Sequence, residues 1–369
     1  MLFRSIIRLI ILNLIINLLD MHSKLILFKN FFLLIVFSYF LTSCQTNLSF
    51  TKVDISHILL DSSLNIRALE IHNNKVYNAT SLGEIYSFDT NKPDLLHVDQ
   101  YSSKIDSVLY PNFRSIAIVN DNVFAITIGS PALLFKNGKV VYRETDEKVF
   151  YDSMDFWNDK EGLVVGDYMN GCISILITRD GGESWKKLDC SMFNNKLPDE
   201  GFFAASDTNI SIIGNKAWVA SGGINSRIYY SDDFGKSWNI IETPIIKGES
   251  TKGIYSIDFY NKKNGFAIGG DYTKPLDNIS NKIITNDGGK TWKTVADNQN
   301  PGYRSCVQYF PNSKGKSLVA IGFNGIDVSN DRGYSWKHIS DESFYTIRFL
   351  NKCTAYAAGK GKISKLHFK

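Results

Sequence analysis

Thr285-Asn-Asp287-Gly-Gly289-Lys-Thr291-Trp292 is one of four copies of the short pattern that decides the fold of this 369-residue chain. The other copies lie at residues 178–185, 231–238 and 329–336, and all four read S/T-x-D-x-G-x-S/T-W. Their aspartates are 53, 54 and 44 residues apart, a period typical of repeat architectures. A motif that occurs four times is more typical of a scaffold than of one active site.

The residue types in the pattern are those of a tight turn that leads into a strand. The Asp and the first Ser/Thr have short side chains that can hydrogen-bond the backbone of the turn, and the Gly allows a positive φ. The Trp begins a strand-like run and can bury about 150–250 Å² of surface. We therefore interpret eight motif residues as structural and not catalytic: Asp180, Trp185, Asp233, Trp238, Asp287, Trp292, Asp331 and Trp336.

The pattern resembles the Asp-box, or bacterial neuraminidase repeat (BNR), over nearly all of the chain after the first fifty residues. The chain looks most similar to WD40/YVTN/BNR-like bacterial proteins related to the photosystem II stability/assembly factors. That resemblance implies a seven-bladed β-propeller that acts as a binding or assembly scaffold for a protein partner. Sialidases share the Asp-box, but their propellers have six blades.

Strand-like segments recur in the same order in each unit. In the unit around Asp287, residues 254–259, 265–269, 282–285 and 292–296 read as strands A to D, so that the Asp-box is the C–D turn. The last unit stops after its third strand, and residues 50–54 resemble 292–296, with Phe50 in the Trp position. An N-terminal strand is thus expected to complete the last blade and close the ring. The prediction is an all-β, seven-bladed propeller of four-stranded antiparallel blades over residues 50–369.

The first fifty residues read as targeting sequence. Residues 31–40 form an apolar run after Lys24 and Lys29, too short to span a membrane but suitable for a signal peptide. The Leu41-Thr-Ser-Cys44 segment that follows resembles a lipobox, although a Cys after a transmembrane anchor is the alternative. We expect a mis-assigned N-terminal extension at 1–20, a lipoprotein signal peptide at 21–43, lipidation at Cys44 and a tether at 44–49. This predicts a lipid-anchored protein of the bacterial cell envelope, on the periplasmic or outer-membrane side.

Composition excludes several functions. The net charge of +4 is small for the length and does not indicate nucleic-acid binding. The six His residues and the Cys residues lack metal-ligand spacing, and no nucleotide-binding motif is present, so we expect no metal and no cofactor. Four cysteines follow Cys44, namely Cys172, Cys190, Cys306 and Cys353. We expect them to be buried free thiols by default, although an oxidising compartment leaves a disulfide possible.

Propeller topology directs the search for a site to one face. Strand A lines the channel, and the D–A and B–C loops lie on the face opposite the Asp-boxes. Loops on a rigid scaffold commonly carry binding residues. In the fourth unit the equivalent channel position is ambiguous and lies around Phe203 or Thr208. Nine residues are expected to converge on this face as ligand-binding candidates: Arg67, Arg114, Asp152, Asp167, Glu200, Tyr255, Asp271, Arg304 and Tyr345.

Three interpretations of that cluster remain open. Arginines that converge repel one another by about 1–4 kcal/mol per close pair and therefore need acids or an external anion. An Arg–Asp ring that ties the blades together would satisfy them internally. Binding of an anionic ligand or of an acidic loop of another envelope protein would satisfy them externally. The third is a sialidase-like or other glycan-acting hydrolase with the same cluster as its site, using paired carboxylates such as Asp152 and Asp167.

Overall fold

The computed structural model describes residues 49–101, 111–193 and 200–369. The chain divides into two compact units, Met1–Asn47 and Leu48–Lys369. The predicted extension, signal peptide and Cys44 lie outside the described residues. Within those ranges no helix has the length and apolar character needed to cross a membrane. All eight clusters of buried apolar side chains lie between Phe50 and Phe368, so the second unit has its own core.

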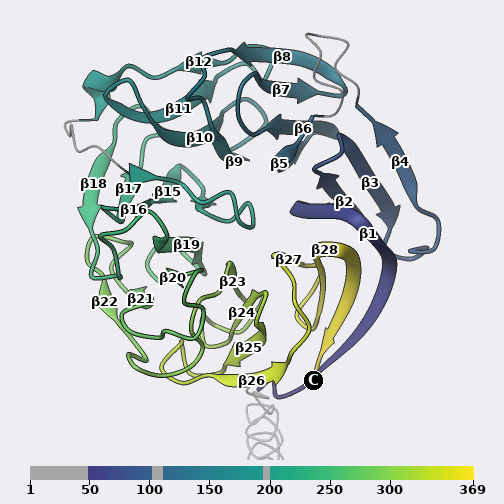
Figure 1. Ribbon diagram of the computed structural model, residues 1–369, viewed down its shortest axis with the longest axis vertical. Coiled ribbons are helices and arrows are strands. Elements are labelled where there is room, and N and C mark those ends of the chain that lie inside the picture. The colour runs from purple at the N-terminus through teal and green to yellow at the C-terminus, as the bar shows by residue number, and fades with distance from the viewer. Residues whose placement is uncertain (1–48, 102–110, 194–199) are drawn as a thin grey trace, which may run out of the picture. The chain divides into compact units, whose positions relative to one another are not determined.

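Figure 1 shows the strands of this unit as sheets arranged radially around a common axis. Antiparallel pairing of consecutive strands builds each sheet, as expected for a propeller blade. Four sheets have four strands: β5 (Phe113–Val119), β6 (Asn122–Thr127), β7 (Ala132–Lys136), β8 (Lys139–Glu144); β9 (Tyr151–Phe156), β10 (Gly162–Met169), β11 (Cys172–Thr178), β12 (Lys186–Lys187); β14 (Ile210–Ile213), β15 (Lys216–Ala220), β17 (Arg227–Ser231), β18 (Asn239–Glu242); and β23 (Cys306–Tyr309), β24 (Leu318–Gly322), β25 (Gly325–Ser329), β26 (Lys337–Ser340).

Two further sheets have six strands each. One gains two short strands from loops and contains β13 (Glu200–Gly201), β16 (Gly222–Gly223), β19 (Lys252–Phe259), β20 (Gly265–Asp271), β21 (Lys282–Thr285) and β22 (Lys293–Thr294). The other joins the two ends of the unit, in the order β27 (Thr346–Phe349), β28 (Thr354–Phe368), β1 (Val53–His72), β2 (Lys75–Thr80), β3 (Glu84–Asp89) and β4 (His97–Gln100). The described residues also contain one 3-10 turn, η1 (Cys190–Met192).

The prediction of seven blades is wrong, because the described strands form six hydrogen-bonded sheets. The cause is the length of β1. Its first part pairs with β28, from Val53 opposite Phe368, and its second part pairs with β2, from Ile66 opposite Thr80. The first and last units of the repeat therefore share one continuous sheet. Counted as hydrogen-bonded sheets, the propeller has six blades, and the seam where the ring closes lies inside one of them.

Each Asp-box forms the same hydrogen-bonded turn. In the copy at Asp287, the Thr285 hydroxyl accepts from the Gly289 N–H at 3.0 Å and donates to the Asp287 carboxylate at 2.8 Å. That carboxylate also accepts from the backbone N–H and the hydroxyl of Thr291, at 3.0 and 2.6 Å. The copies at Asp180, Asp233 and Asp331 repeat this arrangement. The carboxylate oxygens are thus already occupied by the turn itself.

Large side chains fill the space between neighbouring sheets. Trp218 on β15 is fully buried, stacks on Phe259 of β19 at 3.7 Å between ring centroids, and donates its indole N–H to the Gly288 carbonyl at 2.9 Å. It therefore ties one sheet to the Asp-box turn of the next. A disulfide links Cys172 on β11 to Cys190 in η1, so the default expectation of free thiols is wrong for this pair, whereas Cys306 and Cys353 are free.

Candidate functional site

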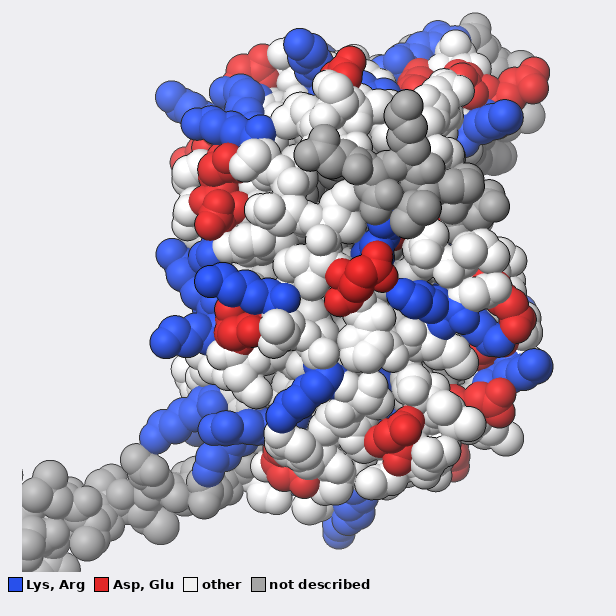
Figure 2. Space-filling model, turned by 90° about the vertical axis from the view of Figure 1, so that its left-hand side faces the viewer, with Lys and Arg blue, Asp and Glu red and all other residues white. Residues whose placement is uncertain are grey.

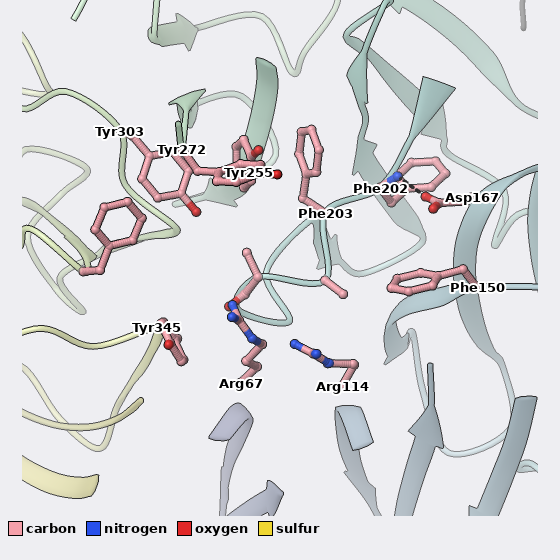
Figure 3. Close-up of a pocket in the computed structure, with 13 residues that line it drawn as sticks. Arg67, Arg114, Phe150, Asp167, Phe202, Phe203, Tyr255, Tyr272, Tyr303 and Tyr345 are labelled. Carbon is pink, nitrogen blue, oxygen red and sulfur yellow. Dashed lines mark hydrogen bonds between the residues drawn. The ribbon is translucent and has the colours of Figure 1, made fainter. Parts of the chain in front are cut away.

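A cavity of about 540 Å³ opens on the side of the ring opposite the Asp-box turns. Figure 3 shows side chains from several sheets pointing into it. Two of these side chains are Arg67 and Arg114, and eight are aromatic. We call this cavity the arginine cavity. Its full lining is Arg67, Arg114, Phe150, Asp167, Phe202, Phe203, Ala204, Ala205, Tyr255, Tyr272, Tyr303, Phe323 and Tyr345.

Arg67 is held without a carboxylate partner. It lies on β1, and its Nη1 donates to the Ala205 carbonyl at 3.2 Å, while its guanidinium lies 4.1 Å from the centre of the Tyr345 ring. The Nε atom is buried and makes no hydrogen bond in the described part of the chain. A stacked guanidinium keeps its charge and can still direct N–H groups toward an anion.

Arg114, on the neighbouring strand β5, has fewer hydrogen-bond partners than Arg67. Its side chain makes no hydrogen bond or ion pair within the described residues, and its Nε is buried. Burial, followed by the charge of Arg67, lowers the pKa of Arg114 to about 10. In Figure 3 the two guanidinium groups lie close together. Two guanidinium groups without a carboxylate partner thus contribute positive charge to the same cavity.

Two carboxyl groups lie near these arginines, but they neutralise them poorly. Asp152 on β9 is fully buried. Its burial, and to a lesser extent the charge of Asp167, raise its pKa well above the ordinary value, while the Ala204 backbone and Arg114 lower it by less. Asp167 on β10 accepts from the Phe202 N–H at 2.7 Å, and burial raises its pKa to about 6. Burial therefore favours the uncharged form of Asp152, and the Asp167 carboxylate is already hydrogen-bonded to the backbone.

Aromatic side chains form the rest of the wall. Phe203 stacks on Tyr255 at 3.8 Å between centroids, and Tyr303 packs edge-on against Tyr255 at 4.7 Å. Phe323 follows at 5.1 Å from Tyr303. Tyr272 and Phe323 remain 48% and 38% exposed at the rim. The cavity thus offers an apolar surface beside two cations, an arrangement that suits a ligand with both an apolar body and a negative group.

The structure brings together five of the nine predicted residues, namely Arg67, Arg114, Asp167, Tyr255 and Tyr345. Asp152 lies buried close to the arginines without lining the cavity. The other three have local partners. Arg304 donates to Asp327 at 2.5 and 2.7 Å, and Asp271 accepts from the backbone and hydroxyl of Thr273 at 2.9 and 2.6 Å. The remaining candidate, Glu200, forms a buried pair with Arg227.

Sequence reasoning missed most of the aromatic wall. Three of these residues lie in segments that lead into an inner strand: Phe150 before β9, Phe202 before β14 and Tyr303 before β23. That shared position is the signal that could have found them. Tyr272 lies in the loop between β20 and β21 and Phe323 in the loop between β24 and β25, where no spacing distinguishes them from other loop residues.

A sialidase-like site would need a Tyr–Glu pair beside the converging arginines. A Tyr–Glu pair is present, since the Tyr229 hydroxyl donates to Glu200 at 2.7 Å. Both side chains are at most 2% exposed and are bound to Arg227, and neither Tyr229 nor Glu200 lines the arginine cavity. Of the three arginines expected at the mouth, Arg304 is not there. Among the described residues, no group of three or more His, Cys, Asp or Glu could hold a metal ion.

Comparisons with known proteins support the fold. The family model for the BNR/Asp-box repeat matches residues 229–239. YCF48 from Cyanidioschyzon merolae superposes with a TM-score of 0.62 at 12% identity, covering 85% of this chain and 98% of that one. A structure of YCF48 bound to a D1 peptide gives 0.57 at 11% identity over 87% and 98%. A streptogramin B lyase gives 0.60 at 13% identity over 86% and 98%. No curated protein matches the sequence.

These likenesses establish a BNR-type β-propeller and leave the family open, because the repeat match is short and the identities are low. The similar structures include YCF48 with a bound peptide, WD40 repeats and a lyase. The same fold therefore serves binding and catalysis, and function must be argued from the site.

Proposed function

We propose that this chain is a non-catalytic binding scaffold of the bacterial envelope that captures an acidic, apolar segment of a partner protein in the arginine cavity. The observation that carries the proposal is the pair of arginines. Arg67 and Arg114 lie together beside aromatic rings, and neither has a carboxylate partner in the described residues. An anion from outside would satisfy them, and an apolar neighbour in the same segment would bury the rings.

A peptide is the class of ligand that fits this lining best. The cavity is open to solvent at a rim formed by Tyr272 and Phe323, and its volume lies within the range of about 300–1,000 Å³ typical of small-ligand sites. The similar YCF48 propeller has been described with a peptide bound. A role in the assembly of a membrane complex, of the kind implied by the photosystem II assembly factors, is the more specific form of this proposal.

An envelope location is part of the proposal and is supported by chemistry in the described chain. The Cys172–Cys190 disulfide is the kind of bond that persists in secreted and periplasmic proteins. Together with the lipobox-like Leu41-Thr-Ser-Cys44 segment, it favours export followed by lipid attachment at Cys44.

Peptide binding tests the proposal directly. Capped peptides with a central Glu between Phe and Leu, and the same peptides with Gln, are titrated against the wild-type chain. We expect the Glu peptide to bind at least about tenfold more tightly, as for a charge-assisted pair of about 1.5 kcal/mol. The difference should vanish in Arg67→Ala/Arg114→Ala and persist in the matched variant Arg179→Ala/Arg332→Ala on the Asp-box side. Equal affinity of both peptides for the wild type would refute the proposal.

A hydrolase remains the second candidate function on one observation, the raised pKa values of Asp152 and Asp167. Acid–base glycan cleavage requires a carboxyl whose uncharged form is favoured next to a second carboxyl, and burial favours that form of Asp152. Turnover of glycan substrates by the wild type, lost in Asp167→Asn, would favour this alternative over the scaffold.

A further inference from the structure

The Asp-box side of the ring carries a cluster of exposed cations. Six basic side chains lie in turns on that side, all exposed, and none forms an ion pair within the described residues. We call this group the basic rim: Lys262, Lys263, Lys290, Lys314, Arg332 and Lys352. In the edge-on view of Figure 2, Lys and Arg side chains gather toward one edge of the ring, on the left.

The turns that carry the basic rim contain few compensating charges. Their only acids are Asp287 and Asp331, whose oxygens are held by the hydroxyl and backbone N–H groups of Thr291 and Ser335. The loops on the cavity side of the same sheets differ, because acids are common there: Asp277, Asp297, Asp341 and Glu342. Within these sheets the positive charge is therefore concentrated on the Asp-box side.

The chain enters the propeller on this same side. The Phe50 N–H donates to Asn330 Oδ1 at 2.9 Å, and Asn330 Nδ2 donates back to the Phe50 carbonyl at 2.8 Å. Asn330 belongs to the fourth Asp-box, between Ser329 and Asp331. Thr51 and Lys369 are also hydrogen-bonded there, at 2.8 Å. Phe50 is thus fixed to the Asp-box turn that also carries Arg332 of the basic rim.

Few residues separate this entry point from the predicted lipid. Cys44 and Phe50 are six positions apart, and an extended chain spans at most about 3.3–3.6 Å per residue, so Phe50 would lie within about 20 Å of a lipidated Cys44. Anionic lipids attract Lys and Arg side chains within about one Debye length of the surface, about 10 Å at 0.1 M salt.

We propose that the basic rim docks on the anionic surface of the membrane to which Cys44 is attached, so that the arginine cavity faces away from the lipid and toward a partner. This inference rests on the lipid anchor of the proposed function. The short tether brings the correct side of the ring to the surface, and the cations hold it there. The occupant of this side is a bilayer that contains acidic headgroups.

Lysine footprinting on vesicles tests the orientation. The mature lipidated protein is reconstituted in phosphatidylcholine vesicles with or without phosphatidylglycerol and briefly acetylated, and modification is read by mass spectrometry. We expect Lys262, Lys314 and Lys352 to react at least about fivefold more slowly on the anionic vesicles, with the protection lost in high salt. Lys148 and Lys274, which are exposed on the cavity side, should react equally on both. Equal reactivity of all five lysines would overturn the proposal.

A charge-reversal variant separates docking from the anchor and from partner binding. In an unlipidated mature chain carrying Cys44→Ser, Lys262→Glu/Lys314→Glu/Lys352→Glu should weaken co-sedimentation with anionic vesicles about a hundredfold, at about fivefold per cation. The control Lys148→Glu/Lys274→Glu should bind as the parent does. The triple variant of the basic rim should not change peptide binding at the arginine cavity, so the two proposals fail separately. Binding to heparin without any response to phosphatidylglycerol would identify a soluble polyanion instead and reject the membrane.

Discussion

Asp167 sets how strongly the arginine cavity can attract an anion. Burial raises its pKa to about 6, so it changes charge near neutral pH beside Arg114 and Arg67. When it is ionised it repels a carboxylate ligand, and when it is protonated that repulsion disappears. A carboxylate on the ligand itself, with an ordinary pKa near 4.3, stays ionised over most of this range.

We therefore predict that an acidic peptide binds roughly fivefold more tightly at about pH 5.5 than at about pH 7.5, since one like charge nearby costs about 1 kcal/mol. Asp167→Asn should bind tightly at both pH values. Titration of a labelled peptide at the two pH values measures this. A slope that persists unchanged in Asp167→Asn would assign the effect to another group.

Trp218 is the residue whose loss should weaken the ring most. It is fully buried, stacks on Phe259 and donates to the Gly288 carbonyl of the adjacent Asp-box turn. Trp218→Ala should lower the free energy of unfolding by about 3–5 kcal/mol, and Trp218→Phe by less, because it keeps the stack. Denaturant unfolding measures both. Tyr334→Ala, at a residue 48% exposed, is the control and should change stability by under about 0.5 kcal/mol.

At the scale of elements, the Asp-box is a self-contained turn that ties the third strand of a sheet to the fourth. Asp287 accepts three hydrogen bonds, from Thr285 and twice from Thr291. Burial of the Asp287 carboxylate raises its pKa, but these hydrogen bonds together lower it by more, so the pKa lies below the ordinary value. A lowered pKa contributes stability that is present above the unfolded value of 3.8 and is lost as the pH falls through the folded value.

Asp287→Ala should accordingly reduce the free energy of unfolding at neutral pH by about 1–2 kcal/mol, a modest loss because the turn is exposed. Asp287→Asn, which keeps an acceptor oxygen, should lose less. Thermal unfolding of the three proteins at pH 7 and at about pH 3 is the measurement. The deficit of the Ala variant should shrink at the lower pH, and a constant deficit would show that charge has no part in it.

The sequence predicted most individual elements and missed one connection between them. Residues 254–259 were expected as an inner strand, and β19 covers Lys252–Phe259. The number of blades was wrong because β1 and β28 each continue through a point where the repeat pattern suggests a boundary. Hydrogen bonding between the two ends of the chain decides that continuity, and no local pattern shows it.

The arginine cavity could be predicted only in part, for a similar reason. In-phase positions on inner strands placed Arg67, Arg114, Tyr255 and Tyr345 correctly. Arg304 occupies an equivalent position, but its guanidinium turns to Asp327 on β25, a pairing that depends on side-chain direction. Most of the aromatic wall, apart from Tyr255 on β19, comes from loops, whose conformation the repeat pattern does not specify.

At the scale of the whole molecule, the centre of the ring contains a second group of acids, of which Asp207 is buried and Asp155 and Asp258 are partly buried. A polar cavity of about 180 Å³ includes Asp155, Asp207 and Asp258 among its lining, with Arg348 paired to Glu70 at 2.7 Å. Burial, with a smaller contribution from Glu70, raises the pKa of Asp155 to about 7, and burial raises that of Asp258 to about 6. The folded protein therefore binds protons that the unfolded chain releases.

A carboxyl whose folded pKa is raised contributes stability that is full below its unfolded pKa and is lost as the pH rises through the folded value. We predict a higher melting temperature at about pH 5 than at about pH 8. Asp155→Asn/Asp258→Asn should flatten that difference, because the amides do not titrate. Calorimetry across this range provides the measurement, and a wild-type protein that is more stable at pH 8 would contradict the prediction.

Site-specific photo-crosslinking tests the central claim, that the arginine cavity captures a partner. A photoreactive phenylalanine analogue replaces Phe323 at the rim of the cavity in the full-length chain in cells, and Tyr334 on the Asp-box side in the control. We expect a discrete crosslinked envelope protein from position 323 that disappears with Arg67→Ala/Arg114→Ala and is absent from position 334. The same crosslinked species with and without the two arginines would contradict it.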